Sequence, residues 1–191
     1  MLVLASGSPR RQEILRNAQI PFVVQVSNIR EEVQDAEPPK ACAERLAREK
    51  ALDVARNRPD DMVLGADTIV VVDGDILGKP ADKTDAVRML RLLAGRSHQV
   101  ITGVCLVSPG GSQEVGSEST LVAMSAVSEN EIHAYVESGE PMDKAGAYAI
   151  QGIASRWIAR IEGDYFNVVG LPVALVWRML RGKTELLKVQ T

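Results

Sequence analysis

The chain has 191 residues, of which 46% are hydrophobic and 25% are charged, and its formal net charge is −3. This length predicts a single domain of one or two lobes, and the composition is typical of a globular enzyme. The acidic balance and the 4% aromatic content argue against a nucleic-acid-binding protein. No apolar run reaches the ~18 residues of a membrane span or resembles a signal peptide. We therefore expect a cytoplasmic protein that binds neither nucleic acid nor membrane.

The predicted elements of the first half alternate between strands and helices. They are a strand at 2–5, a helix over 9–18, a strand at 22–26, a helix at 40–57, a strand pair or one bent strand at 62–72, and a helix at 83–94. Ser8 suits the N-cap position of the first helix, and Pro9 suits its first turn. Gly95 is a plausible stop for the helix before it.

The second half is predicted to begin with long adjacent strands. In chain order it contains strands from residue 98 to about 125 joined at 109–111, a helix to about 138, a loop at 139–152, strands at 157–161 and 165–169, and a helix at 171–180. Ser128 and Glu131 have the spacing of a capping box at the start of the helix. Together the elements predict an α/β protein, with a mixed twisted sheet flanked by helices in one domain over 1–191.

The stretch SGSPRR, residues 6–11, lies at a predicted strand-to-helix junction. A helix N-terminus offers free N–H groups and the positive end of the helix dipole, so it is a ready site for an anion. The hydroxyl of Ser6 and the guanidinium groups of Arg10 and Arg11 suit phosphate oxygens. The alternative is a capped surface helix with two solvated arginines.

Asp67, in the motif GADT, interrupts a long apolar run, so its carboxylate is predicted to be at least partly buried. A buried carboxylate without a partner costs several kcal/mol, so we expect a cation, a metal ion or a strong donor beside it. A general base or a metal ligand meets this requirement. A turn aspartate that accepts backbone N–H bonds meets it equally well.

Lys50 and Lys79 are candidate cations for the same site. Lone lysines are usually solvated, but Lys79 follows a turn from the strand that carries Asp67. Glu31 offers a second carboxylate for a divalent ion, although adjacent glutamates are more often part of a solvated loop. His98 has no partner motif and is interpreted as structural.

The segment EPMDKAGAYAIQG, residues 140–152, is a predicted loop with several specific polar groups. Gln151 is a carboxamide among apolar neighbours. An amide both donates and accepts hydrogen bonds, which suits the edge of a nucleobase. The alternative is a loop held by its own charged pair, Asp143 and Lys144.

Taken together, ASGSPRR, GADT with GKP downstream, DKAGAYAIQG and NVVGLP occur in the order seen in the Maf-like nucleoside triphosphate pyrophosphatases. The resemblance runs from residue 2 to about residue 177. It implies an elongated two-lobed fold similar to that of the inosine triphosphate pyrophosphatases, with a central cleft and often a homodimer. It also implies hydrolysis of nucleoside triphosphates to the monophosphate and pyrophosphate with a divalent cation, Mg²⁺ or Mn²⁺.

The same resemblance implies a role for each candidate residue. Asp67 matches the family's proton acceptor, and Glu31 with Asp67 would hold the divalent cation. The substrate-specificity positions are matched by Arg10, Thr68 and Gln151. Further polar positions of the cleft are matched by Ser6, Arg11, Glu31, Lys50 and Lys79.

The form DKAGAY-IQG resembles the branch of the family that acts on dTTP and UTP. Ala149 departs from that branch, which usually has glycine there, and Asp164-Tyr165-Phe166 is a variant of its Ser-Tyr-Ser-like stretch. We therefore expect a dTTP/UTP pyrophosphatase that serves nucleotide-pool house-cleaning. The alternatives are a 7-methyl-GTP pyrophosphatase and a nucleotide-binding regulator of cell division without turnover.

Overall fold

The computed structural model describes residues 1–183, which divide into two compact units. The first unit comprises Met1–Asp67, Thr102–Glu118 and the described residues from Gly170 onward. The second unit comprises Thr68–Ile101 and Ser119–Val169. The chain passes from the first unit to the second between Asp67 and Thr68, inside one strand.

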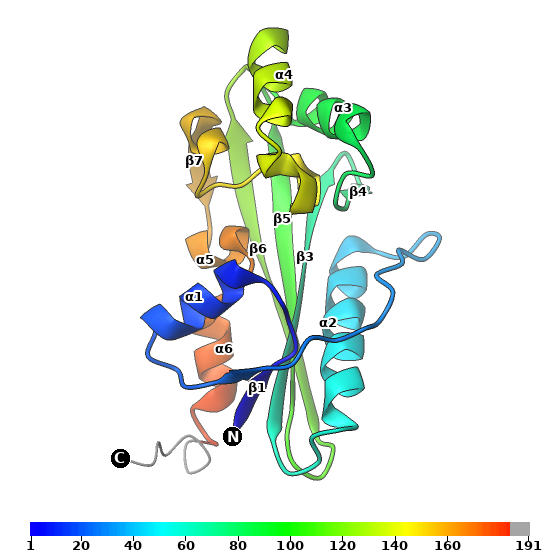
Figure 1. The fold of residues 1–191 in the computed structure, drawn as a ribbon, viewed down its shortest axis with the longest axis vertical. Coiled ribbons are helices and arrows are strands. Elements are labelled where there is room, and N and C mark those ends of the chain that lie inside the picture. Colours follow the sequence, from blue (N-terminus) through cyan, green and yellow to red (C-terminus); the bar gives the residue numbers. More distant parts are fainter. Residues whose placement is uncertain (184–191) are drawn as a thin grey trace. The chain divides into compact units, whose positions relative to one another are not determined.

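The elements follow one another as labelled in Figure 1. The first half contains β1 (Leu2–Leu4), α1 (Pro9–Asn17), β2 (Val23–Val24), α2 (Pro39–Ala55), β3 (Met62–Val72), β4 (Asp75–Leu77) and α3 (Lys83–Leu93). The second half contains β5 (Ser97–Val107), β6 (Gln113–Met124), α4 (Glu129–Glu137), β7 (Ile158–Glu162), α5 (Tyr165–Val169) and α6 (Val173–Leu180). Short 3₁₀ turns η1 (Glu140–Asp143), η2 (Ala145–Ala147) and η3 (Ile153–Trp157) stand between α4 and β7.

The strands of the described residues form one seven-stranded sheet in the order β2-β1-β3-β5-β6-β7, with β4 also paired to β3. β1 is parallel to both β2 and β3, with Val3 opposite Val23 and Val63. The β3–β4 and β6–β7 pairs are antiparallel. The predicted mixed sheet flanked by helices is therefore confirmed, and the apolar run 62–72 is one continuous strand.

Two helices, α1 and α4, begin where local capping signals predict. Ser8 caps α1, with its hydroxyl accepting from the backbone N–H of Arg11, and Pro9 is the first residue of that helix. At α4 the predicted capping box is present, with Ser128 and Glu131 each bonded to the other's backbone N–H. These side chains bond to N–H groups that have no partner within the helix. The capped residues therefore mark the point where each helix begins.

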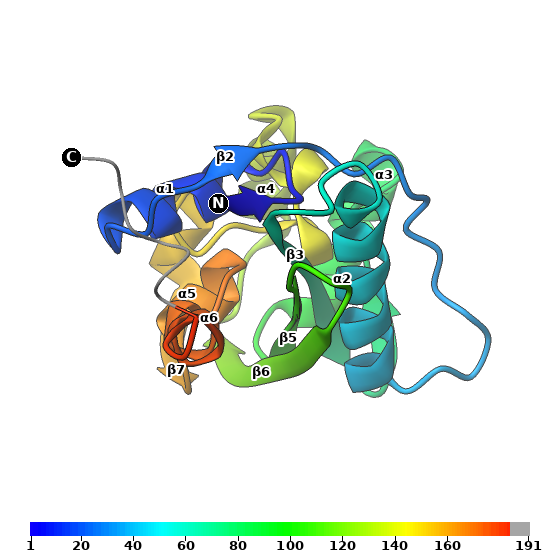
Figure 2. The same ribbon diagram turned by 90° about the horizontal axis from the view of Figure 1, so that it is seen from below.

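In the first unit, α2 packs closely against β3 and β5 because glycines face it. A Cβ atom on Gly65 of β3 would lie 2.2 Å from the carbonyl oxygen of Ala47. A Cβ atom on Gly103 of β5 would lie 2.2 Å from that of Ala43. Small residues on both sides thus bring the helix backbone onto the strands, and α2 runs beside β3 and β5 in both views (Figures 1 and 2).

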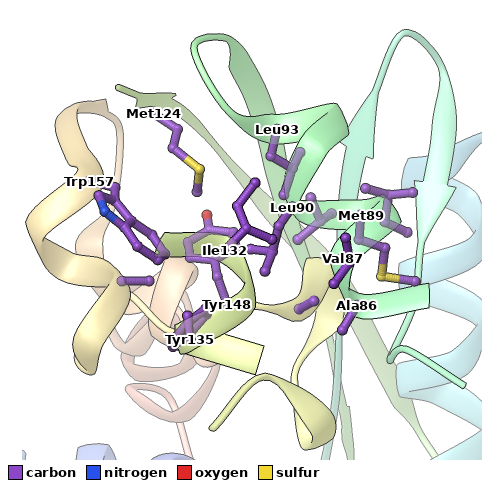
Figure 3. Packing of buried hydrophobic residues seen from close by; sticks show 14 of the residues in the cluster. Ala86, Val87, Met89, Leu90, Leu93, Met124, Ile132, Tyr135, Tyr148 and Trp157 are labelled. Carbon is purple, nitrogen blue, oxygen red and sulfur yellow. The ribbon is translucent and has the colours of Figure 1, made fainter. Parts of the chain in front are cut away.

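The core of the second unit gathers side chains from α3, α4, the strands and the 3₁₀ turns (Figure 3). Leu90 and Leu93 of α3 and Ile132 and Tyr135 of α4 are buried in it. The ring of Tyr135 meets the ring of Trp157 edge to face at 5.2 Å between centroids. Aromatic pairs in this geometry stabilise a core beyond the area that they bury.

The predicted strand at 165–169 is wrong, since these residues form α5. A carboxylate oxygen of Asp164 accepts the N–H of Phe166 at 2.8 Å, which starts a helical turn. The side chain of the buried Asn167 donates to the carbonyl of Val100 at 2.9 Å and to the hydroxyl of Thr120 at 3.0 Å. These side-chain bonds outweigh the strand preference of the aromatic and β-branched residues.

Other differences are small. The strand predicted at 22–26 shortens to β2, and the predicted loop at 139–152 contains the turns η1 and η2. Within residues 1–183, no helix combines the length and the apolar character needed to cross a membrane.

Candidate active site

A buried arginine in the first turn of α1 is bonded to the loop that precedes this helix. Arg11 is 9% exposed, and its Nη1 donates to the hydroxyl of Ser6 at 3.1 Å. Its Nε donates to the carbonyl oxygen of Gly170 at 2.8 Å. Ser6 also accepts the N–H of Ser8 at 3.3 Å. Arg11 is therefore held in place rather than solvated, whereas Arg10 is partly exposed.

Two carboxylates act on the charge of this arginine. Burial lowers the pKa of the Arg11 guanidinium, while Asp67 and Glu31 raise it and Arg10 lowers it further. Burial disfavours the charged form, and nearby carboxylates favour it. Arg11, Asp67 and Glu31 thus belong to one electrostatic cluster in the first unit.

Lys50 of α2 is paired with both carboxylates of this cluster. Its ammonium group is 2.5 Å from Oδ1 of Asp67 and 2.7 Å from Oε1 of Glu31. The side chains of Lys50 and Asp67 are 9% and 7% exposed, and that of Glu31 is 41% exposed. Of the three expected partners of Asp67, a cation, a metal ion or a strong donor, the structure places a cation, Lys50, beside it. Asp67 lies within β3 rather than in a turn.

The close packing of α2 brings the pair together. Residues two apart on a strand share a face, so Asp67 points to the same side as Gly65, where α2 approaches. Lys50 lies three residues after Ala47, on the same face of α2. A side chain larger than hydrogen at Gly65 would move the helix and separate the lysine from the aspartate.

The donor set is suited to a hard divalent cation that also binds a substrate. One carboxylate oxygen of Glu31 and one of Asp67 both contact the positively charged ammonium group of Lys50. Mg²⁺ is commonly held by one or two carboxylates together with substrate phosphates. Within residues 1–183, no group of three or more His, Cys, Asp or Glu side chains could hold a metal ion. A metal at this position would therefore need ligands from the substrate.

The remaining candidates lie in the second unit. Thr68 is the residue after Asp67 and is partly exposed, while Lys79 and Gln151 are exposed. The N–H of Gly146 donates to the carbonyl of Gly78 at 3.0 Å. This bond joins the stretch that carries Lys79 to the loop that carries Gln151.

Gly170 belongs to the motif NVVGLP, but no role for it was predicted from the sequence. Its carbonyl oxygen is the acceptor for Arg11, 159 residues away in the chain. Gly170 has φ of +126°, a conformation that favours glycine. The glycine in the motif was the only feature of the sequence that could have indicated a role. No local pattern indicates that its carbonyl group bonds to an arginine.

Comparison with known proteins agrees with the motifs. The family model described as Maf-like protein matches residues 1–183. A dTTP/UTP pyrophosphatase of Koribacter versatilis is 55% identical over 180 residues, which cover 94% of this chain and 93% of that protein. A dTTP/UTP pyrophosphatase of Symbiobacterium thermophilum is 56% identical over 179 residues, with 94% and 92% covered. Among solved structures, the Ham1 protein of Staphylococcus aureus matches 95% of this chain and 98% of its own, with a TM-score of 0.48 and 14% identity.

Proposed function

We propose that this chain, which belongs to the Maf-like protein family, hydrolyses dTTP and UTP to the nucleoside monophosphate and pyrophosphate. Relatives named dTTP/UTP pyrophosphatase, 55% and 56% identical over 94% of the chain, support this activity. The observation that carries the proposal is the buried Asp67–Lys50 pair next to Arg11, with the exposed Glu31 also bonded to Lys50. Burying charged groups costs desolvation free energy even when they are paired, and clusters of this kind gather at functional sites.

In the proposed reaction, a water molecule attacks the α-phosphorus and pyrophosphate leaves. Asp67 orients this water and accepts its proton. Lys50, 2.5 Å from Asp67, compensates the negative charge of the carboxylate and holds it in one orientation. A positioned base of this kind typically contributes about 10²- to 10⁴-fold to the rate.

Positive side chains would stabilise the negative charge that builds up on the leaving pyrophosphate. We assign this task to Arg10, Arg11, Lys50 and Lys79, with Ser6 binding a phosphate oxygen beside Arg11. Because phosphoryl transfer depends mainly on positioning and charge stabilisation, these contacts would carry much of the catalysis. The hydrogen bonds of Arg11 to Ser6 and Gly170 support a preorganised guanidinium.

A divalent cation, Mg²⁺ or Mn²⁺, is part of the proposal. Glu31 and Asp67 would hold it together with phosphate oxygens of the substrate. When bound, the cation would neutralise phosphate charge and polarise the phosphoryl group. The two carboxylate oxygens that converge on the Lys50 ammonium support this assignment.

Selection of the base is assigned to Gln151, with Arg10 and Thr68 as further specificity residues. Uracil and thymine present an N3–H donor beside carbonyl acceptors. A carboxamide such as that of Gln151 can accept from N3–H and donate to the neighbouring carbonyl. Cytosine presents the opposite pattern, so a carboxamide held in one orientation would discriminate against it.

A cytoplasmic location and a homodimer complete the proposal. The homodimer rests on the likeness to the family that the motifs carry, and the location rests on the composition of the chain. Sedimentation of the purified protein at twice the mass of the chain would support the dimer, and sedimentation at the mass of one chain would contradict it.

The experiment that tests this function measures pyrophosphate release from dTTP, UTP, CTP and 7-methyl-GTP at one subsaturating concentration. Reactions contain Mg²⁺, Mn²⁺ or a chelator. We expect dTTP and UTP to be the best substrates and the chelator to abolish release. A faster reaction with 7-methyl-GTP would contradict the assigned branch. Binding of dTTP without any release of pyrophosphate would contradict the enzyme and favour a regulatory role.

A further inference from the structure

Gln151 lies in a tight turn whose two flanks are attached to the same pair of side chains. The N–H of Gly152 donates to the carbonyl of Ala149 at 3.1 Å, which closes the turn around Gln151. On one side, the N–H of Ala149 donates to the hydroxyl of Tyr135 at 3.3 Å. On the other side, the N–H of Ile153 donates to the carboxylate of Glu140, at 3.0 Å from Oε1 and 3.2 Å from Oε2.

The two anchors are themselves connected. The hydroxyl of Tyr135 donates to Oε1 of Glu140 at 2.9 Å, so it accepts from the turn and donates to the carboxylate at once. The result is a continuous chain of hydrogen bonds from Ala149 through Tyr135 and Glu140 to Ile153. Chains of this kind strengthen their members and define a single arrangement when every member is satisfied.

Tyr135 is fixed by core packing, and Gly152 leaves space for the carboxylate of Glu140. Tyr135 is 1% exposed and is packed in the core of the second unit (Figure 3). A Cβ atom on Gly152 would lie 2.1 Å from Oε1 of Glu140, so a side chain at this position would displace the carboxylate from the turn. Neither Tyr135 nor Glu140 is among the residues assigned to bind substrate.

We propose that Tyr135 and Glu140 are positioning residues that set the base selectivity of Gln151, an inference that rests on the proposed function. A carboxamide can turn over to match either uracil or cytosine, so it discriminates only when its position and orientation are restricted. The Tyr135–Glu140 pair restricts the backbone on both sides of Gln151. Releasing that backbone lets the carboxamide adapt to cytosine and narrows the preference for dTTP over CTP.

The test compares kcat/KM for dTTP with kcat/KM for CTP in the wild type and in Tyr135→Phe, which keeps the buried ring and removes only the hydroxyl. We expect the dTTP:CTP ratio to fall about 3- to 10-fold, in the lower part of the range of coupling found within one hydrogen-bond network. Glu140→Gln should lower the ratio less than Glu140→Ala, because its amide oxygen still accepts one of the bonds. Ile132→Val is the matched control, since it alters the same core one turn away on α4 and leaves the Tyr135 hydroxyl in place. Its ratio should equal that of the wild type.

A second background separates positioning from a general structural effect. In a protein carrying Gln151→Ala, Tyr135→Phe should leave the ratio unchanged, because the group that it positions is gone. An unchanged ratio in Tyr135→Phe alone, or an equal fall in the Gln151→Ala background, overturns the inference. The ratio of dissociation constants for dTTP and CTP, measured in chelator, is followed in the same variants. If the wild type shows no turnover, the proposed function is refuted. The ratio of the dissociation constants for dTTP and CTP would still decide the role of Tyr135 and Glu140.

Discussion

At the residue scale, the ammonium group of Lys50 is shared by two carboxylates of unequal burial. Asp67 is nearly inaccessible, whereas Glu31 remains partly exposed. A buried carboxylate that lost its cation would be strongly destabilising, so Lys50 is needed for the fold as well as for the proposed reaction. The role of Asp67 is therefore better tested by changing Asp67 itself than by removing the lysine.

Replacing Asp67 with asparagine is expected to abolish most of the turnover while keeping the fold. The amide has nearly the same shape and still accepts from Lys50, but it takes no proton and carries no charge. We expect kcat for dTTP to fall about 10²- to 10⁴-fold, as measured by pyrophosphate release.

Asp73→Asn is the matched control for this variant. Asp73 follows β3, is exposed, and pairs with Arg96 at 2.6 Å. Its φ of +53° is a conformation that asparagine tolerates. This variant should turn over dTTP like the wild type. Near-normal turnover in Asp67→Asn would remove Asp67 from the mechanism.

At the element scale, the contact of α2 with β3 and β5 is predicted to tolerate no additional atom. In Gly103→Ala the new Cβ would meet the backbone of Ala43, which cannot rotate away as a flexible side chain can. We expect the free energy of unfolding to fall by about 1–3 kcal/mol, the usual range for overpacking. Urea unfolding measures this change.

Gly78→Ala provides the comparison for Gly103→Ala. Nothing lies within 4 Å of a Cβ atom at Gly78, so the same substitution adds an atom in open space. Its stability should stay within about 0.5 kcal/mol of the wild type. Equal stability of the two variants would contradict the close packing of α2.

At the scale of the whole molecule, stability is expected to depend on the ionisation of His98. This residue is 2% exposed, and its Nε2 lies 2.7 Å from the hydroxyl of Tyr148. Among residues 1–183, its Nδ1 has no hydrogen-bond partner. Burial lowers the pKa of His98 from 6.5 to about 4, so the folded protein keeps the ring neutral.

The sign of the effect follows from the two pKa values. The unfolded chain binds a proton near pH 6.5, whereas the folded chain binds it only near pH 4. The contribution of His98 to stability is therefore complete above pH 6.5 and is lost as the pH falls towards 4. A shift of this size corresponds to about 3 kcal/mol.

His98→Gln should remove this part of the pH dependence. Urea unfolding at several pH values between 7 and 4 measures the free-energy difference between the variant and the wild type. We expect the difference to move in favour of the variant as the pH falls. The exposed His133→Gln is the control and should keep the slope of the wild type, since His98 is intact. Parallel curves for wild type and His98→Gln would contradict the prediction.

Features that depend on neighbouring residues could be predicted from the sequence. The caps at Ser8 and Ser128 are local, because a side chain there reaches an N–H group three residues away. The mixed α/β sheet follows from the alternation of apolar strands and capped helices. The burial of Asp67 follows from the apolar residues on either side of it. Each of these interpretations needed only a short window of the chain.

Contacts between residues far apart in the chain were decided only by the tertiary structure. Lys50 meets Asp67 because glycines let α2 approach β3, and Arg11 meets the carbonyl of Gly170 after 159 residues. The residues of α5 favour a strand by propensity but form a helix, because Asn167 bonds to groups on β5 and β6. A hydrogen bond or an ion pair depends on the final positions of both partners, and those positions are set by the packing of the whole unit rather than by either stretch of sequence.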